Sequence, residues 1–217
     1  MKRYLPFIII IAVLVAAVVV GWRLLPKEGA APTLETSSNT EGLTRPNVKV
    51  SSPVVLEEYG DYQCPPCGLL YPELKKIEAE YGDQLQIVFH HFPLTKIHKN
   101  ALLAAHAAEA ARMQNRFWEM HDRLYRNQKA WADSDDARKI FVGYAGELGL
   151  DTAKFERDLD SAEVEQRVNA DTEQAMSRGI NSTPTIIIEG RQLKADATTP
   201  DGIRRGINMM LTRKARS

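Results

Sequence analysis

Cys64 and Cys67 are the only two cysteines of the chain, and two prolines separate them. On a helix, this spacing places both sulfurs on one face of a single turn, close enough to bond. A disulfide between them would close a very small ring and would restrict the unfolded chain little, so a purely structural role is a poor explanation. The pair is therefore a candidate redox-active disulfide, which needs no cofactor beyond its own sulfur atoms.

The residues around the pair predict a strand, a turn and a helix. A β-branched stretch at 53–59 ends at a glycine, and helix formers occupy 69–81, with an apolar face made by Leu69, Leu70, Leu74 and Ile77. Cysteines at the start of that helix would lie beside unpaired N–H groups, which favour a thiolate. We expect Cys64 to be the exposed attacking thiol with a lowered pKa, and Cys67 to be the buried resolving thiol.

The rest of the chain predicts an α/β domain with a large block of helices. A strand at 85–92 would complete a β-α-β unit with parallel strands. The next part is rich in Ala, Glu, Arg and Leu and predicts helices at 98–113, 116–126, 134–148, 152–159 and 162–178, with N-cap sites at Asp133-Ser134 and Asp151-Thr152. A strand at 185–189, a short strand that pairs back at 192–195 and a helix at 200–213, starting at Thr199-Pro200, complete the pattern.

Residues 1–22 predict an N-terminal transmembrane helix. Lys2 and Arg3 precede an apolar run from Leu5 to Trp22, whose length of about 18 residues is at the short end of what spans a bilayer. The positive-inside tendency would hold the N-terminus in the cytoplasm and place the catalytic part in the periplasm, outside the cytoplasmic membrane. A cleaved signal peptide is the alternative, and it leads to the same export.

Composition predicts one domain after this segment. Residues 23–46 would form a flexible linker, and residues 47–217 are enough for a single core, with the helical insert at about 95–178. The 28 basic and 28 acidic side chains cancel, so the chain lacks the electrostatic footprint of a nucleic-acid-binding protein.

A metal site is the main alternative for a pair of cysteines at this spacing. Zinc needs about four ligands, and the chain has no second pair of cysteines, so histidines would have to complete the site. His90 and His91 are adjacent on a predicted strand and would point to opposite faces, while His98, His106 and His121 fall in predicted helices. We expect no metal site, and a copper- or zinc-binding chaperone is the less favoured alternative.

Two separated segments resemble the DsbA-like branch of the thioredoxin superfamily. They read EYGDYQCPPC at residues 58–67 and GINSTPT at residues 179–185. The resemblance extends over about residues 47–213. It implies a thioredoxin-like fold with a large helical insert between the β-α-β half and a cis-proline strand, and a thiol-disulfide oxidoreductase with the Cys64–Cys67 disulfide as its redox group.

The resemblance also implies roles for residues outside the CxxC motif. Thr183 and Pro184 would form a cis-proline loop beside the cysteines and would present the Thr183 backbone to an extended substrate. Glu58, six residues before Cys64, would relay protons to Cys67 from a partly buried position. A slip of one residue in register would exchange Glu58 with Glu57, which we otherwise expect in solvent.

Pro66 departs from the strongly oxidising members of the branch, which have a histidine at this position. Proline offers neither an N–H nor an imidazole charge to the Cys64 thiolate, so the disulfide should be less oxidising. We expect an oxidase of reduced or unfolded exported proteins, recharged by a membrane redox partner, with Pro65 and Pro66 in the active-site turn. An envelope reductase or isomerase is the alternative, and we expect a monomer without nucleic-acid partners.

Overall fold

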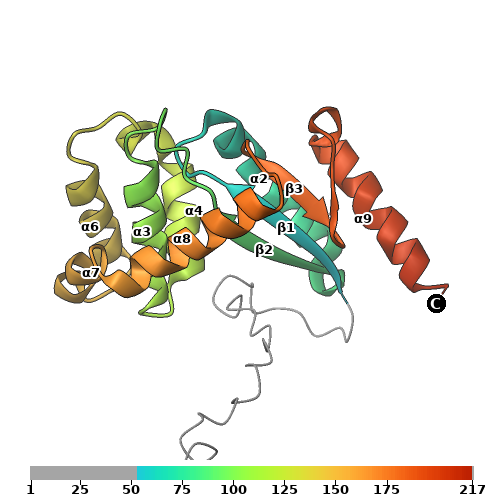
Figure 1. Ribbon diagram of the computed structural model, residues 1–217. Helices are drawn as coiled ribbons and strands as arrows, with labels where there is room; N and C mark the ends of the chain where they lie inside the picture. Colours follow the sequence, from blue (N-terminus) through green and yellow to red (C-terminus); the bar gives the residue numbers. More distant parts are fainter. Residues whose placement is uncertain (1–52, 217) are drawn as a thin grey trace, which may run out of the picture. The chain divides into compact units, whose positions relative to one another are not determined.

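The computed structural model describes residues 53–216, which form a four-stranded sheet with packed helices and a helical block to one side (Figure 1). The predicted transmembrane segment at 1–22 and the linker at 23–46 lie outside the described residues. Within residues 53–216, no helix combines the length and the apolar character needed to cross a membrane.

The sheet has the strand order β2-β1-β3-β4. Its central strand β1 (Val54–Gly60) pairs parallel with β2 (Leu85–His91) and antiparallel with β3 (Thr185–Ile188), and β4 is the short strand Arg191–Gln192. The helix α2 (Pro65–Tyr81) and the short 3-10 helix η2 (Gly82–Gln84) connect the two parallel strands. The predicted β-α-β unit is therefore confirmed, as is the return of the chain to the sheet after the helical block.

Alternation along β1 divides its side chains between two helical layers. Val54 and Leu56 pack with α2 and with α9 (Pro200–Lys214) on one face of the sheet. Tyr59 faces α8 (Ala162–Ser177) on the other face, where it packs with Ala175. Because side chains along a strand alternate, Glu58 belongs to the face that α2 covers.

The helical insert is made of short helices around a core of their own. Its helices before α8 are α3 (Ala101–Arg112), α4 (Phe117–Arg126), α5 (Gln128–Trp131), α6 (Ala137–Glu147) and α7 (Thr152–Asp158). The predicted helices of this block are confirmed, and α5 is an additional helix that the sequence pattern missed. After the block, the 3-10 helix η3 (Ala195–Ala197) precedes α9. This insert forms the left-hand part of Figure 1, beside the end of α2 that carries the cysteines.

Two helix starts follow the predictions and one does not. The Asp151 side chain accepts a hydrogen bond from the Lys154 N–H, and the Thr199 hydroxyl accepts one from the Gly202 N–H. The N-cap expected at Asp133-Ser134 is wrong, because α6 begins after Asp136 and no side chain caps it. The Ser134 hydroxyl instead closes the preceding turn by accepting from the Asp136 N–H at 3.0 Å.

One predicted core residue of α2 lies at the surface. Cys67, Leu70, Leu74 and Ile77 face the core, whereas the Leu69 side chain is 77 % exposed. Leu69 is two residues from Cys67, which on a helix corresponds to nearly opposite sides. The orientation of Cys67 toward the core thus turns Leu69 outward.

Candidate active site

The two cysteines lie at the start of α2. Cys64 is the N-cap residue, and Pro65 and Pro66 occupy the first helical positions, where a missing N–H breaks no helical hydrogen bond. Both cysteines are free thiols; Cys64 is 4 % exposed and Cys67 is completely buried. The prediction of an exposed Cys64 is therefore wrong, because only a small part of the residue reaches the surface, although it is more accessible than Cys67.

The two thiols differ strongly in acidity. A hydrogen bond from the Cys67 side chain and a second from the Thr183 side chain lower the pKa of Cys64 to about 6, against the effect of burial. Burial, the bond to Cys64 and the charge of Glu58 raise the pKa of Cys67 well above its usual range. At neutral pH the pair is thus one thiolate at Cys64 and one thiol at Cys67.

The loop before β3 lies against the reactive sulfur. The Thr183–Pro184 peptide bond is cis, and the Cys64 sulfur lies 3.5 Å from the Thr183 carbonyl oxygen. The structure therefore brings together Cys64 and the cis-proline loop, as the resemblance implied.

Glu58 lies on the cysteine side of the sheet and is buried, with 3 % exposure. It lines a small cavity of about 10 Å³ between the sheet, α2 and α4, together with Tyr71, Leu74, Lys75, Glu78, Ile87, Trp118 and His121. A cavity of this size is close to the minimum that can hold one water molecule. The partly exposed Lys75 and Glu78 place its outer end near solvent.

Glu57 is not the solvated neighbour that we expected. It faces α8, where it forms ion pairs with Arg178 at 2.7 Å and with His90 at 3.3 Å. Although burial opposes the change, hydrogen bonds from His90 and Arg178 lower the pKa of Glu57 to about 2. Its place on the opposite face to α2 leaves Glu58 as the acidic side chain of β1 beside Cys67.

Two side-chain amides, of Gln128 and Gln63, hold the cysteine loop, and neither was singled out from the sequence. Gln128 donates to the carbonyl oxygens of Tyr62 at 2.7 Å and Cys64 at 2.9 Å. Gln63 donates to the Ala132 carbonyl at 2.6 Å and accepts from the Asn100 N–H at 2.7 Å. These bonds attach the active-site loop to α5 and to the loop before α3.

A buried acidic residue also follows the end of β1. The Asp61 carboxylate lies 2.6 Å from His98 Nδ1 and accepts the backbone N–H groups of Gln63 and Leu94. His98 was expected in a helix, but α3 begins only at Ala101, and His98 lies in the preceding loop. The hydrogen bonds of this loop to Asp61 take the place of another turn of helix.

The other histidines do not assemble with the cysteines. His90 pairs with Asp171 and Glu57, whereas His91 pairs with Glu109, so the two side chains diverge as predicted. Within residues 53–216, no three His, Cys, Asp or Glu side chains are grouped so that they could bind a metal ion.

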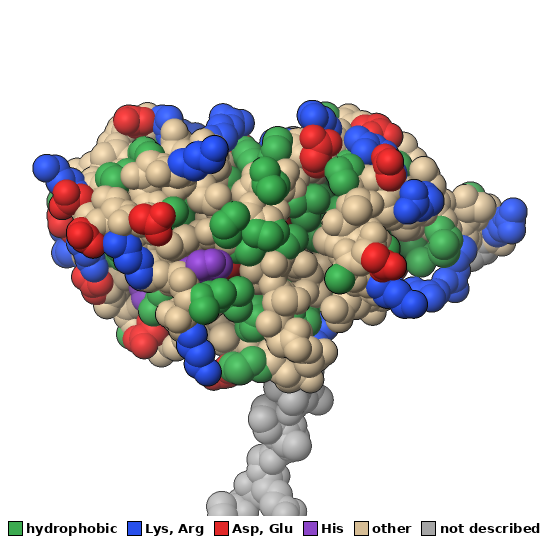
Figure 2. All heavy atoms as spheres, turned by 90° about the horizontal axis from the view of Figure 1, so that it is seen from above, with side chains coloured by type: hydrophobic (Ala, Val, Ile, Leu, Met, Phe, Trp, Pro, Cys, Tyr) green, Lys and Arg blue, Asp and Glu red, His purple; other side chains and the backbone are tan. Residues whose placement is uncertain are grey.

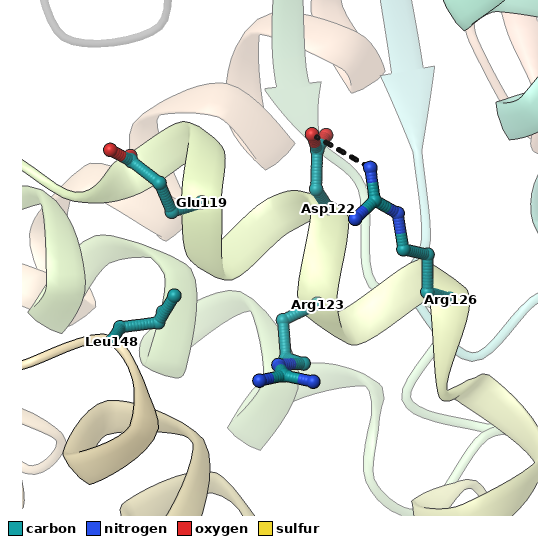
Figure 3. Close-up of a pocket in the computed structure, with 5 residues that line it drawn as sticks. All are labelled: Glu119, Asp122, Arg123, Arg126 and Leu148. Atoms are coloured by element: carbon teal, nitrogen blue, oxygen red, sulfur yellow. Dashed lines mark ion pairs between the residues drawn. The ribbon is translucent and has the colours of Figure 1, made fainter.

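A second cavity, of about 290 Å³, lies on the outer side of α4. Figure 3 shows that charged side chains line it, and Asp122 and Arg126 form an ion pair there at 3.7 Å. Its lining residues are Glu119, Asp122, Arg123, Arg126 and Leu148, and they include neither cysteine.

Comparisons with known proteins agree with this geometry. The family model described as "Thioredoxin" (Thioredoxin_4) matches residues 49–208. BdbD from Bacillus subtilis in its oxidised form superposes with a TM-score of 0.66 at 24 % identity, over 78 % of this chain and 92 % of that one. The thiol-disulfide exchange protein alpha-DsbA2 from Wolbachia pipientis gives a TM-score of 0.64 at 17 % identity, over 81 % and 93 % of the two chains.

Curated relatives match by sequence over a shorter stretch. The Na(+)/H(+) antiporter NhaA 1 of Mycolicibacterium gilvum (strain PYR-GCK) is 38 % identical over 143 residues, which are 65 % of this chain and 22 % of the relative. The chain thus spans about a fifth of the length of such relatives. The family match over residues 49–208 shows that the chain belongs to the thioredoxin family, and its fold is shared with solved DsbA-like proteins.

Proposed function

We propose that this protein oxidises pairs of thiols in exported proteins, as a disulfide oxidase held at the outer face of the cytoplasmic membrane. The observation that supports this direction is the lowered pKa of Cys64, at about 6. A stabilised Cys64 thiolate favours the reduced enzyme, so the disulfide is the better oxidant. This pKa lies between about 7 for thioredoxin and about 3.5 for DsbA, and we expect an oxidant of intermediate strength.

The proposed cycle starts from the Cys64–Cys67 disulfide. A substrate thiolate attacks the Cys64 sulfur, a mixed disulfide forms, and Cys67 leaves as a thiolate that takes a proton, for which Glu58 is the proposed donor. A second substrate thiolate then attacks the substrate sulfur of the mixed disulfide and releases the Cys64 thiolate. The substrate loses two electrons to the cysteine pair, and a membrane redox partner must remove them.

The exposed apolar surface next to the cysteines is an argument for an incompletely folded substrate. Pro65 and Pro66 are exposed, and Leu69 and Ile97 are 77 % and 72 % exposed. Figure 2 shows hydrophobic side chains toward the middle of the face seen from above, with many charged side chains toward its edge. Such a surface suits chains whose apolar residues are not yet buried, and the Thr183 backbone is the proposed pairing edge for them.

The membrane setting rests on the sequence and on the relatives. Residues 1–22 have the charge and apolar pattern of a signal-anchor. The curated relatives carry the matching segment in chains named as Na(+)/H(+) antiporters, and an antiporter exchanges ions across a membrane. Both observations favour a redox domain that works close to a membrane.

A turnover assay with the full-length protein tests the activity. The oxidised protein should form the disulfide of a reduced, unfolded substrate, and the Cys64→Ser variant should not. Cys67→Ala should accumulate a mixed disulfide when its Cys64 thiolate attacks the disulfide form of the substrate, because no second cysteine is present to resolve it. The redox potential measured against glutathione should fall between about −270 and −120 mV. A potential at or below the lower value would identify a reductase and overturn the proposed direction.

Labelling in intact cells tests the location. A membrane-impermeant thiol reagent should modify the reduced protein, whose only cysteines are Cys64 and Cys67, and the protein should stay in the membrane fraction after carbonate extraction. Protection of both thiols until the cells are lysed, despite labelling of the purified protein, would contradict the proposed location.

A further inference from the structure

We propose that Asp61 and His98 form a positioning pair that tunes the redox strength of the cysteine pair, in which the hydrogen bond from His98 weakens the effect of the Asp61 charge on Cys64. The inference rests on the proposed role of Cys64 as the attacking thiol. It concerns two residues outside both the CxxC motif and the cis-proline loop. The two side chains come from the end of β1 and from the loop before α3.

The Asp61 carboxylate is completely buried, and its hydrogen bonds account for its stability there. Oδ1 accepts the N–H of Gln63 at 2.7 Å, and Oδ2 accepts the N–H of Leu94 at 2.9 Å and lies 2.6 Å from His98 Nδ1. A buried carboxylate requires such partners, because its desolvation is otherwise very costly. Of the three donors only His98 is a side chain, so it alone can be removed without altering the backbone.

Asp61 is directly connected to the reactive cysteine. The Cys64 N–H donates to the Asp61 carbonyl oxygen at 3.1 Å, which closes a tight turn between the two residues. The hydrogen bond from Cys67 lowers the pKa of Cys64 most, burial raises it, and the negative charge of Asp61 adds a smaller effect that also raises it. A hydrogen-bond donor that holds the Asp61 charge therefore favours the Cys64 thiolate.

His98 is held in the geometry that this role requires. A carboxylate only accepts hydrogen bonds, so Nδ1 must carry the proton that it donates to Asp61. The His98 N–H bonds to the Leu94 carbonyl at 3.0 Å, and the Leu94 N–H bonds to Asp61, so the loop is fixed at two points. The imidazole is 15 % exposed.

The pair of Asp61 and His98 compensates for the missing histidine in the CxxC motif. Pro66 stands where strong oxidants of this kind have a histidine, and it offers neither a donor nor a charge. His98 supplies an imidazole from a loop 34 positions away from Cys64 in sequence, by way of Asp61. The side chain acts on the thiolate through the hydrogen bond that it makes with Asp61, and not by contact with the sulfur.

Thiolate titrations of four full-length, reduced variants test the pair. His98→Ala should raise the Cys64 pKa and shift the equilibrium with glutathione three- to tenfold toward the enzyme disulfide. Asp61→Asn should shift both quantities in the opposite direction, because it removes the charge. His98→Asn keeps a neutral donor at the position of Nδ1 and should stay within twofold of the wild type.

His106→Ala is the matched control. His106 also bonds through Nδ1, to the Leu159 carbonyl at 3.0 Å, but it lies on α3 and has no bond to the cysteine loop. It should leave the Cys64 pKa and the glutathione equilibrium unchanged. Shifts of the same size in His106→Ala and His98→Ala would overturn the proposal.

Further results distinguish this inference from a purely structural role of the pair and from failure of the proposed function. If His98→Ala and Asp61→Asn shifted the glutathione equilibrium in the same direction, or neither shifted it twofold, the pair would be purely structural and the proposal wrong. If Asp61→Asn did not fold, the two His98 variants would still test the proposal, because equal shifts in His98→Ala and His98→Asn would contradict it. A wild-type protein without exchange with glutathione would instead refute the proposed function.

Discussion

The Cys64 sulfur lies 3.5 Å from the carbonyl oxygen of Thr183, a residue 119 positions further along the chain. The thiol donates to this carbonyl, and the Thr183 side chain hydrogen-bonds to the thiolate and lowers the pKa of Cys64. The Thr183 hydroxyl is buried and has no hydrogen-bond partner among the described residues while Cys64 is a thiol, so it is available to the thiolate. The residue before the cis-proline therefore affects the acidity of the attacking cysteine directly.

The Thr183→Val substitution removes that hydroxyl at nearly constant volume. Because a hydrogen bond to a charged group is worth about 1.5–3 kcal/mol, we expect the Cys64 pKa to rise from about 6 by about one unit or more. Thiolate absorbance as a function of pH measures this change. Thr183→Ser keeps the hydroxyl and is the control, and an unshifted Thr183→Val titration would contradict the assignment.

The Cys67 thiol is the largest favourable influence on the Cys64 thiolate. Cys67→Ala removes this donor, so the Cys64 pKa should rise toward the value of an ordinary thiol. Cys67→Ser retains an O–H donor at the same position and should keep most of the lowering. Iodoacetamide alkylation rates across a pH series distinguish the two variants, and equal profiles would show that the hydrogen bond is unimportant.

The acidity of Cys64 also predicts how stability depends on pH. The folded pKa of about 6 is below the reference value of 9.0, so the thiolate stabilises the reduced protein fully above about pH 9, and this contribution is lost as the pH falls to about 6. Urea unfolding should therefore show a stability difference between reduced wild type and Cys64→Ser that grows from pH 6 to pH 9. Cys67 is present in both proteins, so its own titration, from the ordinary 9.0 in the unfolded state to a raised pKa in the folded state, largely cancels in the comparison. A constant difference would contradict the lowered pKa.

Asp171 connects α8 to the sheet. Its carboxylate bonds to His90 Nδ1 at 3.2 Å and to the His91 N–H at 2.8 Å, and although burial opposes the change, Asp171 and Glu57 raise the pKa of His90 to about 9. Asp171→Asn leaves the buried His90 with Glu57 as its one remaining anionic partner, so we expect a loss of about 2 kcal/mol and of about 4–8 °C in Tm.

The loss in Asp171→Asn should depend on pH in a defined direction. A raised histidine pKa stabilises the folded state fully below about pH 6.5, and that contribution disappears as the pH rises through about 9. The difference in Tm from the wild type should therefore shrink above pH 9. Asp160→Asn, which affects an exposed pair with Arg138, should change Tm little at any pH. An equal loss in both variants would mean that the Asp171 network adds no more than a surface ion pair.

Several features of the site could be predicted from the sequence because their signals are local. The spacing of Cys64 and Cys67, the glycine that ends β1 and the strand composition on both sides defined the β-α-β unit. Strand alternation placed Glu58 with Val54 and Leu56, and the structure has all three on the α2 face. The two resembling segments also indicated that Thr183 would lie beside Cys64.

Other features could not be predicted, because they depend on the path of the backbone between distant residues. The sequence alone did not indicate that Gln128 would donate to the Cys64 carbonyl or that the Gln63 side chain would accept the Asn100 N–H, since amide side chains carry no periodic signal. His98 was expected in a helix because its neighbours favour helix, and hydrogen bonds to Asp61 override that preference.

Two thiols at helical spacing, after a strand and within a family pattern, indicate thiol chemistry from local sequence signals. The tertiary structure alone decided how reactive those thiols are. The acidity of Cys64 depends on the side chains of Cys67, Thr183 and Asp61, and its accessibility depends on how the surrounding loops pack. Distance and desolvation set both properties, and a folded chain fixes these quantities whereas local sequence patterns do not.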